Sequence, residues 1–174
     1  MVYTCMAGWD ETKDAPCDRG EIYVRLVQGY LKGERPEKAV RYQFHSPCCK
    51  MIRRQLVADH GLRFSEVRTG NDALFSVGVG YWARKIEVVD RVTYVATISG
   101  NNISRRWDFD SVICRYEEDL KINRFMRRHG EWRWQLPILE QLKPYGWRKR
   151  IKMLRLAIHY GQPLMVDCYS LIQW

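Results

Sequence analysis

Hydrophobic and polar residues alternate along much of the first two-thirds of the chain. The alternation over 62–68, 74–82 and 86–98 has the two-residue period of half-buried strands, and we predict a strand in each segment. Residues 22–31 are rich in β-branched and aromatic side chains and fit a strand or a short helix, of which we favour the strand. Residues 39–45 also alternate and are predicted as a strand.

Further along the chain, apolar residues recur every three or four positions instead. Asp110 is predicted to cap a helix that carries an apolar stripe and stops at Gly130. A short helical segment is predicted over 137–142, and a second full helix over 147–160.

This change of period predicts an α+β fold, with a strand-rich N-terminal two-thirds and a smaller helical C-terminal region. We predict a mainly β (α/β) domain over 1–108. Residues 109–174 are predicted as a helical region with a basic face and a helix that could dock a partner.

Positive charge is concentrated in one part of the chain. The net charge is +9, and 121–155 contains eleven basic and two acidic residues, so the remainder is neutral on balance. A cluster of this kind favours a polyanion as partner, and we predict RNA binding through phosphate contacts. The residues predicted to bind RNA are Arg127, Arg128, Arg133, Arg148, Lys149 and Arg150.

Four aromatic residues, Trp132, Trp134, Tyr145 and Trp147, are interleaved with these cations. Aromatic rings beside basic residues suit single-stranded nucleic acid, because bases stack on the rings. The alternative is a solvated basic helix face with its tryptophans in the core, and the sequence leaves both open.

No residue pattern indicates catalysis, and we predict that the protein is not an enzyme. The four histidines are scattered, and no glycine-rich phosphate loop opens a helix. Six irregularly spaced cysteines without a secretory leader favour a reducing compartment. No apolar run reaches the roughly 18 residues that a membrane span needs.

Metal binding has two weak candidates, Cys114 and His129, on one predicted helix. A structural zinc needs four ligands and no second pair follows, so we expect no zinc or other cofactor. The cluster of His45 with Cys48 and Cys49 is better explained as a strand that runs into a turn.

The helix predicted over 147–160 has a wide apolar surface. Such a helix either completes the core of its own domain or lies in a groove of a partner. The sequence alone favours completion of the core.

Short matching pieces across about 24–160 occur in the order found in a known family, and the chain resembles the lentiviral Vif family, closest to its small-ruminant, maedi-visna-like branch. The pieces are Val24-Arg25-Leu26, Lys50-Met51-Ile52-Arg53-Arg54 with Leu56, Phe64, Gly78-Val79 with Tyr81, Arg106-Trp107-Asp108, Phe125-Met126 with His129 and Trp132, and Arg155-Leu156-Ala157.

The resemblance implies an elongin C-binding helix, whose family pattern is small polar, Leu, Gln, any residue, Leu, Ala. Here 152–157 stands in its place: Met153, Leu156 and Ala157 keep its apolar character, while Lys152 and Leu154 depart from it. Family members also carry zinc ligands upstream of this helix. Of those positions, only Cys114 and His129 match in this chain.

The function implied by the resemblance is that of a viral accessory adaptor in the host cytoplasm or the virion. It would recruit APOBEC-family cytidine deaminases to a ubiquitin ligase of elongin B, elongin C and cullin-5, with a host stabilising protein such as cyclophilin as a further partner. Such an adaptor acts by raising effective concentration, without chemistry of its own. The alternative is a basic, tryptophan-rich viral or phage protein that binds single-stranded nucleic acid.

Overall fold

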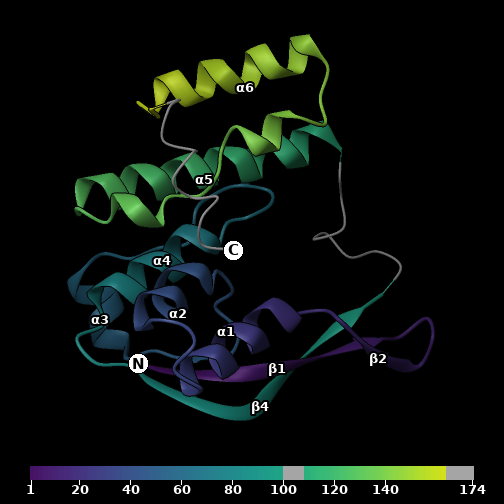
Figure 1. Ribbon diagram of the computed structural model, residues 1–174, viewed down its shortest axis with the longest axis vertical. Helices are drawn as coiled ribbons and strands as arrows, with labels where there is room; N and C mark the ends of the chain where they lie inside the picture. The colour runs from purple at the N-terminus through teal and green to yellow at the C-terminus, as the bar shows by residue number, and fades with distance from the viewer. Residues whose placement is uncertain (100–107, 164–174) are drawn as a thin grey trace. The chain divides into compact units, whose positions relative to one another are not determined.

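The computed structural model describes residues 1–99 and 108–163, and the chain forms two compact units (Figure 1). The N-terminal unit comprises Met1–Ser65 and Phe75–Arg106. The C-terminal unit comprises Trp107–Trp174 together with an earlier segment, Glu66–Leu74. The α+β class predicted from the sequence is confirmed.

A mixed four-stranded sheet organises the N-terminal unit. Its centre is β1 (Val2–Asp10), along which β4 (Glu87–Ile98) runs parallel. The short strands β2 (Ala15–Cys17) and β3 (Lys50–Met51) pair antiparallel with opposite ends of β1. The predicted strand over 86–98 is thus confirmed as β4.

Two helices, α1 (Glu21–Leu31) and α2 (Glu37–Gln43), lie on one side of this sheet (Figure 1). Phe44, just after α2, is fully buried, with its ring 5.5 Å from that of Tyr3 in β1 and 4.4 Å from that of Tyr23 in α1. This aromatic cluster joins the helices to the sheet.

The helices α3 (Arg54–Asp59) and α4 (Ala73–Trp82) complete the unit. A Cβ atom at Gly80 would lie 2.2 Å from the carbonyl oxygen of Arg41, so glycine allows α4 to approach α2 closely. The Arg41 guanidinium donates to the carbonyl oxygens of Gly80 (2.7 Å) and Ala83 (2.6 Å) and fastens the crossing.

Four predicted strands in this unit are wrong. Residues 22–31, 39–45 and 74–82 lie largely in helices, and 62–68 contains neither helix nor strand. Residues 75–80 of α4 are all buried, so this helix lacks the polar face that would reveal a helical period. The segment 22–31 buries side chains at helical spacing despite its strand-like composition.

The C-terminal unit contains α5 (Phe109–Arg128), α6 (Trp147–His159) and two 3-10 turns, η2 (Trp132–Trp134) and η3 (Glu140–Leu142). The cap of α5 is Asp108 rather than the predicted Asp110. Its carboxylate accepts from the backbone N–H of Ser111 (2.9 Å) and from its hydroxyl (2.8 Å).

The ends of these two helices agree with the sequence. Gly130, with φ of +74°, follows the end of α5, and Gly146 precedes α6. Of the helical segment predicted over 137–142, only the three residues of η3 are helical. The core of the unit consists of Tyr116, Leu120, Ile138, Leu142, Met153 and Ala157.

Candidate nucleic-acid interface

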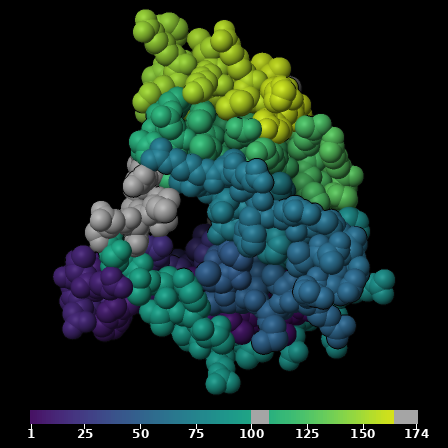
Figure 2. All heavy atoms as spheres, turned by 180° about the vertical axis from the view of Figure 1, so that it is seen from behind, coloured from purple at the N-terminus to yellow at the C-terminus, as the bar shows by residue number. Residues whose placement is uncertain are grey.

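Five exposed basic residues follow one another along α6. The helix carries Arg148, Lys149, Arg150, Lys152 and Arg155 and no acidic residue. Figure 2 shows α6, in yellow, at the surface of the C-terminal unit. With its basic side chains in solvent and no acid on the helix, α6 presents a strongly positive surface.

Exposed cations without an acidic partner extend beyond α6. Lys121 pairs with Glu118 at 2.7 Å, and Lys143 pairs with Glu140. Within residues 108–163, eight exposed cations form no ion pair with a carboxylate. Two of them, Lys149 and Arg150, have other close partners. The remaining six, which we call the free cations of the C-terminal unit, are Arg124, Arg128, Arg133, Arg148, Lys152 and Arg155.

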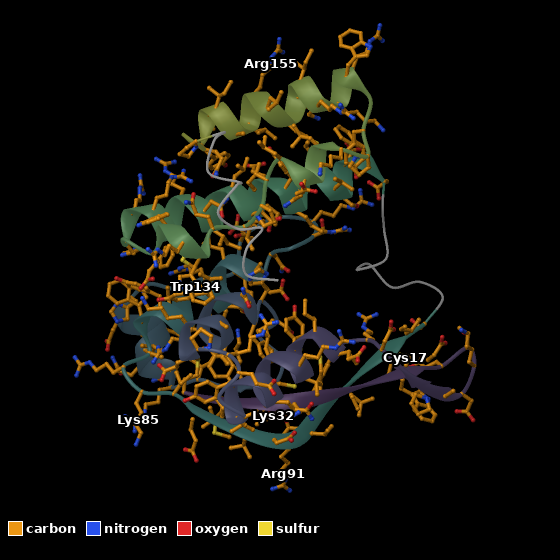
Figure 3. All side chains as sticks on the ribbon, viewed as in Figure 1. Cys17, Lys32, Lys85, Arg91, Trp134 and Arg155 are labelled. Atoms are coloured by element: carbon orange, nitrogen blue, oxygen red, sulfur yellow. The ribbon has the colours of Figure 1, made fainter. Side chains whose placement is uncertain are left out.

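Two of the free cations lie over exposed tryptophan rings. The guanidinium carbon of Arg148 is 5.2 Å from the Trp147 ring centre, and that of Arg133 is 5.4 Å from the Trp132 ring centre. Trp147 is 67% exposed and Trp132 46%. Both rings are therefore accessible for stacking, whereas Trp134, labelled in Figure 3, is half-buried.

Arg127 is half-buried, and its guanidinium is engaged by groups of its own unit. Its guanidinium donates to the side-chain oxygens of Gln135 (2.8 Å) and Gln162 (2.7 Å) and to the carbonyl oxygen of Tyr160 (3.0 Å). Burial lowers the pKa of this guanidinium, although it stays charged. We therefore leave Arg127 out of the RNA surface proposed below.

Two other predicted RNA contacts are exposed but already have partners. Arg150 donates to the carbonyl oxygens of Tyr145 (2.5 Å) and Lys143 (2.8 Å). The Lys149 ammonium lies 4.7 Å from the centre of the Phe109 ring, nearer than the Lys152 ammonium at 5.5 Å. Arg128, Arg133 and Arg148 lie as predicted on the surface.

The helix face predicted to dock elongin C points into the core of the unit. Met153 and Ala157 are fully buried beside Tyr116 and Leu120, and Leu156 is half-buried against the same core. In this structure the predicted docking face is occupied by the protein itself, as the simpler interpretation of the sequence expected.

The candidate zinc ligands cannot bind the same ion. Cys114 lies in the second turn of α5, and His129 follows the end of that helix, so 15 residues separate them by about 22 Å along the helix axis. Within the described residues, no three His, Cys, Asp or Glu side chains come together as metal ligands. Cys168 lies outside those residues.

The other proposed cluster is also accounted for by local bonds. The Nε2–H of His45 donates to the carbonyl oxygen of Tyr42 (2.9 Å), and the Cys49 thiol donates to the carbonyl oxygen of Cys5 (3.1 Å). Burial, together with the nearby Lys50 ammonium, lowers the pKa of His45 to about 4. This histidine is therefore neutral near pH 7.

Three of the free cations, Arg124, Lys152 and Arg155, are not among the residues predicted to bind RNA. Their signal is spacing: Arg124 lies four residues before Arg128, and Lys152 three before Arg155, so each pair shares one helix face.

No family model matches the chain, and no curated protein and no solved structure matches it. None of the described helices is long and apolar enough to span a membrane. The site must therefore be interpreted from its own geometry.

Proposed function

We propose that the protein binds single-stranded RNA through the C-terminal unit. The observation that supports this proposal is the set of six free cations, none of which is neutralised by a carboxylate within the described residues. Each cation that meets a phosphate releases condensed counterions, which provides sequence-independent affinity.

A preference for single strands rests on the exposed tryptophans. Trp132 and Trp147 are partly exposed, and a guanidinium lies over each ring. An unpaired base can stack on such a ring while the guanidinium binds the flanking phosphate. Bases in a duplex are stacked on each other and would not be available.

The test is the salt dependence of RNA binding. Replacing Arg148, Lys152 and Arg155 by alanine removes three phosphate contacts and should reduce the slope of log K against log salt by about 2 for a single strand. The matched control replaces Lys32, Lys85 and Arg91, three exposed cations of the N-terminal unit (Figure 3). Equal slopes for the two triple variants would reject the proposal.

A second candidate is the ubiquitin-ligase adaptor function implied by the resemblance to Vif. It rests on the ordered sequence pieces, in particular on Leu156, which is only half-buried and so partly available. Elongin C could reach Met153 and Ala157 only if α6 left its core, because both are fully buried.

The adaptor candidate is tested by a pull-down of the full chain with elongin B/C. If the adaptor function holds, the complex with elongin B/C forms, and Leu156→Ala weakens it at least tenfold. In cells that express the Leu156→Ala variant together with a deaminase, the deaminase should then persist. Absence of binding, or binding that Leu156→Ala leaves unchanged, rejects docking by this helix. The melting temperature of Leu156→Ala separates a lost contact from a lost fold.

A further inference from the structure

The outer side of α6 carries a second apolar stripe, which adjoins the buried face at Leu154. Trp147 and Ile158 are each 67% exposed, Ile151 is 41% exposed, and Leu154 is half-buried and packs in part against the core of the unit. The four residues are spaced by four, three and four positions, which is the spacing of the apolar seam in a coiled coil. We call these four residues the α6 seam.

The positions beside the α6 seam are basic. Arg148 and Arg155 each follow a seam residue directly, on one edge, and Arg150 precedes Ile151 on the other. In heptad terms Ile151 and Ile158 occupy a, Trp147 and Leu154 occupy d, and the three arginines occupy e and g. These flanking positions select the partner by charge.

We propose that the α6 seam docks an amphipathic helix of a partner protein that has apolar residues on one stripe and Glu or Asp beside it. A second copy of this chain is disfavoured, because its arginines would face these arginines. RNA also fits the seam less well, since the isoleucines offer no ring for stacking. The seam shares Trp147 with the proposed RNA surface, and the free cations Arg148 and Arg155 flank it, so a partner helix and RNA would compete for this side of α6.

The length of α6 sets what the partner must provide. Its 13 residues extend about 20 Å, enough for two heptads of contact. A partner helix of at least three turns with Leu or Ile at its own a and d positions would cover the exposed tryptophan and isoleucines.

The probe is a labelled 21-residue helical peptide with Leu or Ile at a and d and Glu at e and g, added to the full-length protein. Fluorescence anisotropy should show saturable binding. A peptide with Lys at e and g, and an acidic peptide interrupted by proline, should not bind. Binding of all three peptides alike would overturn the proposal.

Two variants separate docking from folding. Ile158→Asp should weaken binding of the acidic peptide at least tenfold without lowering the melting temperature, because the side chain is mostly in solvent. Ile22→Asp is the matched control, since Ile22 is 54% exposed on α1 in the other unit. An unchanged affinity for Ile158→Asp would refute docking at this stripe.

A charge reversal provides the strongest test. Arg148→Glu combined with Arg155→Glu should transfer the preference from the Glu peptide to the Lys peptide. Retained preference for the Glu peptide contradicts the proposal. If the protein self-associates and Ile158→Asp abolishes this, the seam binds a second copy of the chain. If Ile158→Asp weakens RNA binding and peptide binding equally, the seam belongs to the RNA site. Either result replaces the proposal.

Discussion

Different interactions stabilise the interior of each of the two units. In the N-terminal unit the centre is apolar and aromatic, as in the contact of Tyr3 with Phe44. In the C-terminal unit the buried amides of Asn123, Gln135 and Gln162 form a polar network with the half-buried Arg127, beside a small apolar core. The free cations that we propose for RNA binding are also in this unit.

This contrast shows where the chain can accept a charge. A guanidinium is stable inside the C-terminal unit only because three oxygens surround it, whereas the outward-facing cations of α6 have solvent instead. Neighbouring residues of one helix therefore have opposite tolerances to substitution, and this can be measured.

The largest effect is expected at Ala157. Ala157→Asp places an unpaired carboxylate in the core of the C-terminal unit and should destabilise it by about 3–5 kcal/mol. Amide hydrogen exchange should show lost protection in α5 and α6 while β1 and β4 stay protected. Ile158→Asp, one residue further on, is the control and should change little; a fully folded Ala157→Asp would show that this face does not pack in the core.

The next effect is expected at Arg127. Arg127→Ala leaves buried oxygens without their donor and should reduce the free energy of unfolding of the C-terminal unit by about 2–3 kcal/mol. The exposed neighbour Arg128 provides the matched variant, and Arg128→Ala should stay within about 0.5 kcal/mol. Urea denaturation measures both. Similar losses for the two variants would place Arg127 on the surface after all.

The helices of the C-terminal unit were predictable because their signals are local. The apolar stripe of α5, the glycine after it and Gly146 before α6 all lie within a few residues of the feature they determine. In α4 the signal fails, because burial on all sides removes the polar face. The central strand β1 was not predicted, since its pairing with β4 joins residues about 85 positions apart.

The candidate site was predictable as a region but not residue by residue. Composition located the basic segment, yet it does not separate Arg127 from its neighbour Arg128. What separates them is Gln162, which lies 35 positions away and accepts from Arg127 only once the unit has folded. The buried orientation of Met153 likewise depends on α5, which a helical period cannot identify as the covering surface.

Changes in pH should affect the two units in opposite directions. The pKa of His45 is lowered to about 4 by burial, so below pH 6.5 the unfolded chain takes up a proton that the N-terminal unit does not, and the unit loses stability. The pKa of Asp119 is raised to about 6, chiefly by burial, so the folded C-terminal unit binds a proton more tightly and regains stability as the pH falls.

Between pH 8 and pH 5 each contribution amounts to about 1–2 kcal/mol. Hydrogen exchange resolved by unit is the measurement. Asp119→Asn should remove the acid-side gain of the C-terminal unit, because the amide does not titrate, and leave the N-terminal unit unchanged. Parallel responses of both units would contradict the assignment of these two groups.

The smallest effect is expected where both units use the same device, a glycine in the left-handed region just after a helix. Gly33 follows α1 with φ of +76°, and Gly130 follows α5 with φ of +74°. Nothing lies within 4 Å of a Cβ added at either position, so only the backbone opposes a side chain. Alanine at each position should therefore lower the free energy of unfolding by about 1 kcal/mol.

Gly146 provides the control, because it is equally open but has φ of −67°. Gly146→Ala should change the free energy of unfolding by no more than about 0.5 kcal/mol, because that φ suits any residue. Urea denaturation of the three variants decides between the outcomes. Equal losses at all three glycines would show that φ does not determine the cost, and a neutral Gly130→Ala would show that the end of α5 rearranges.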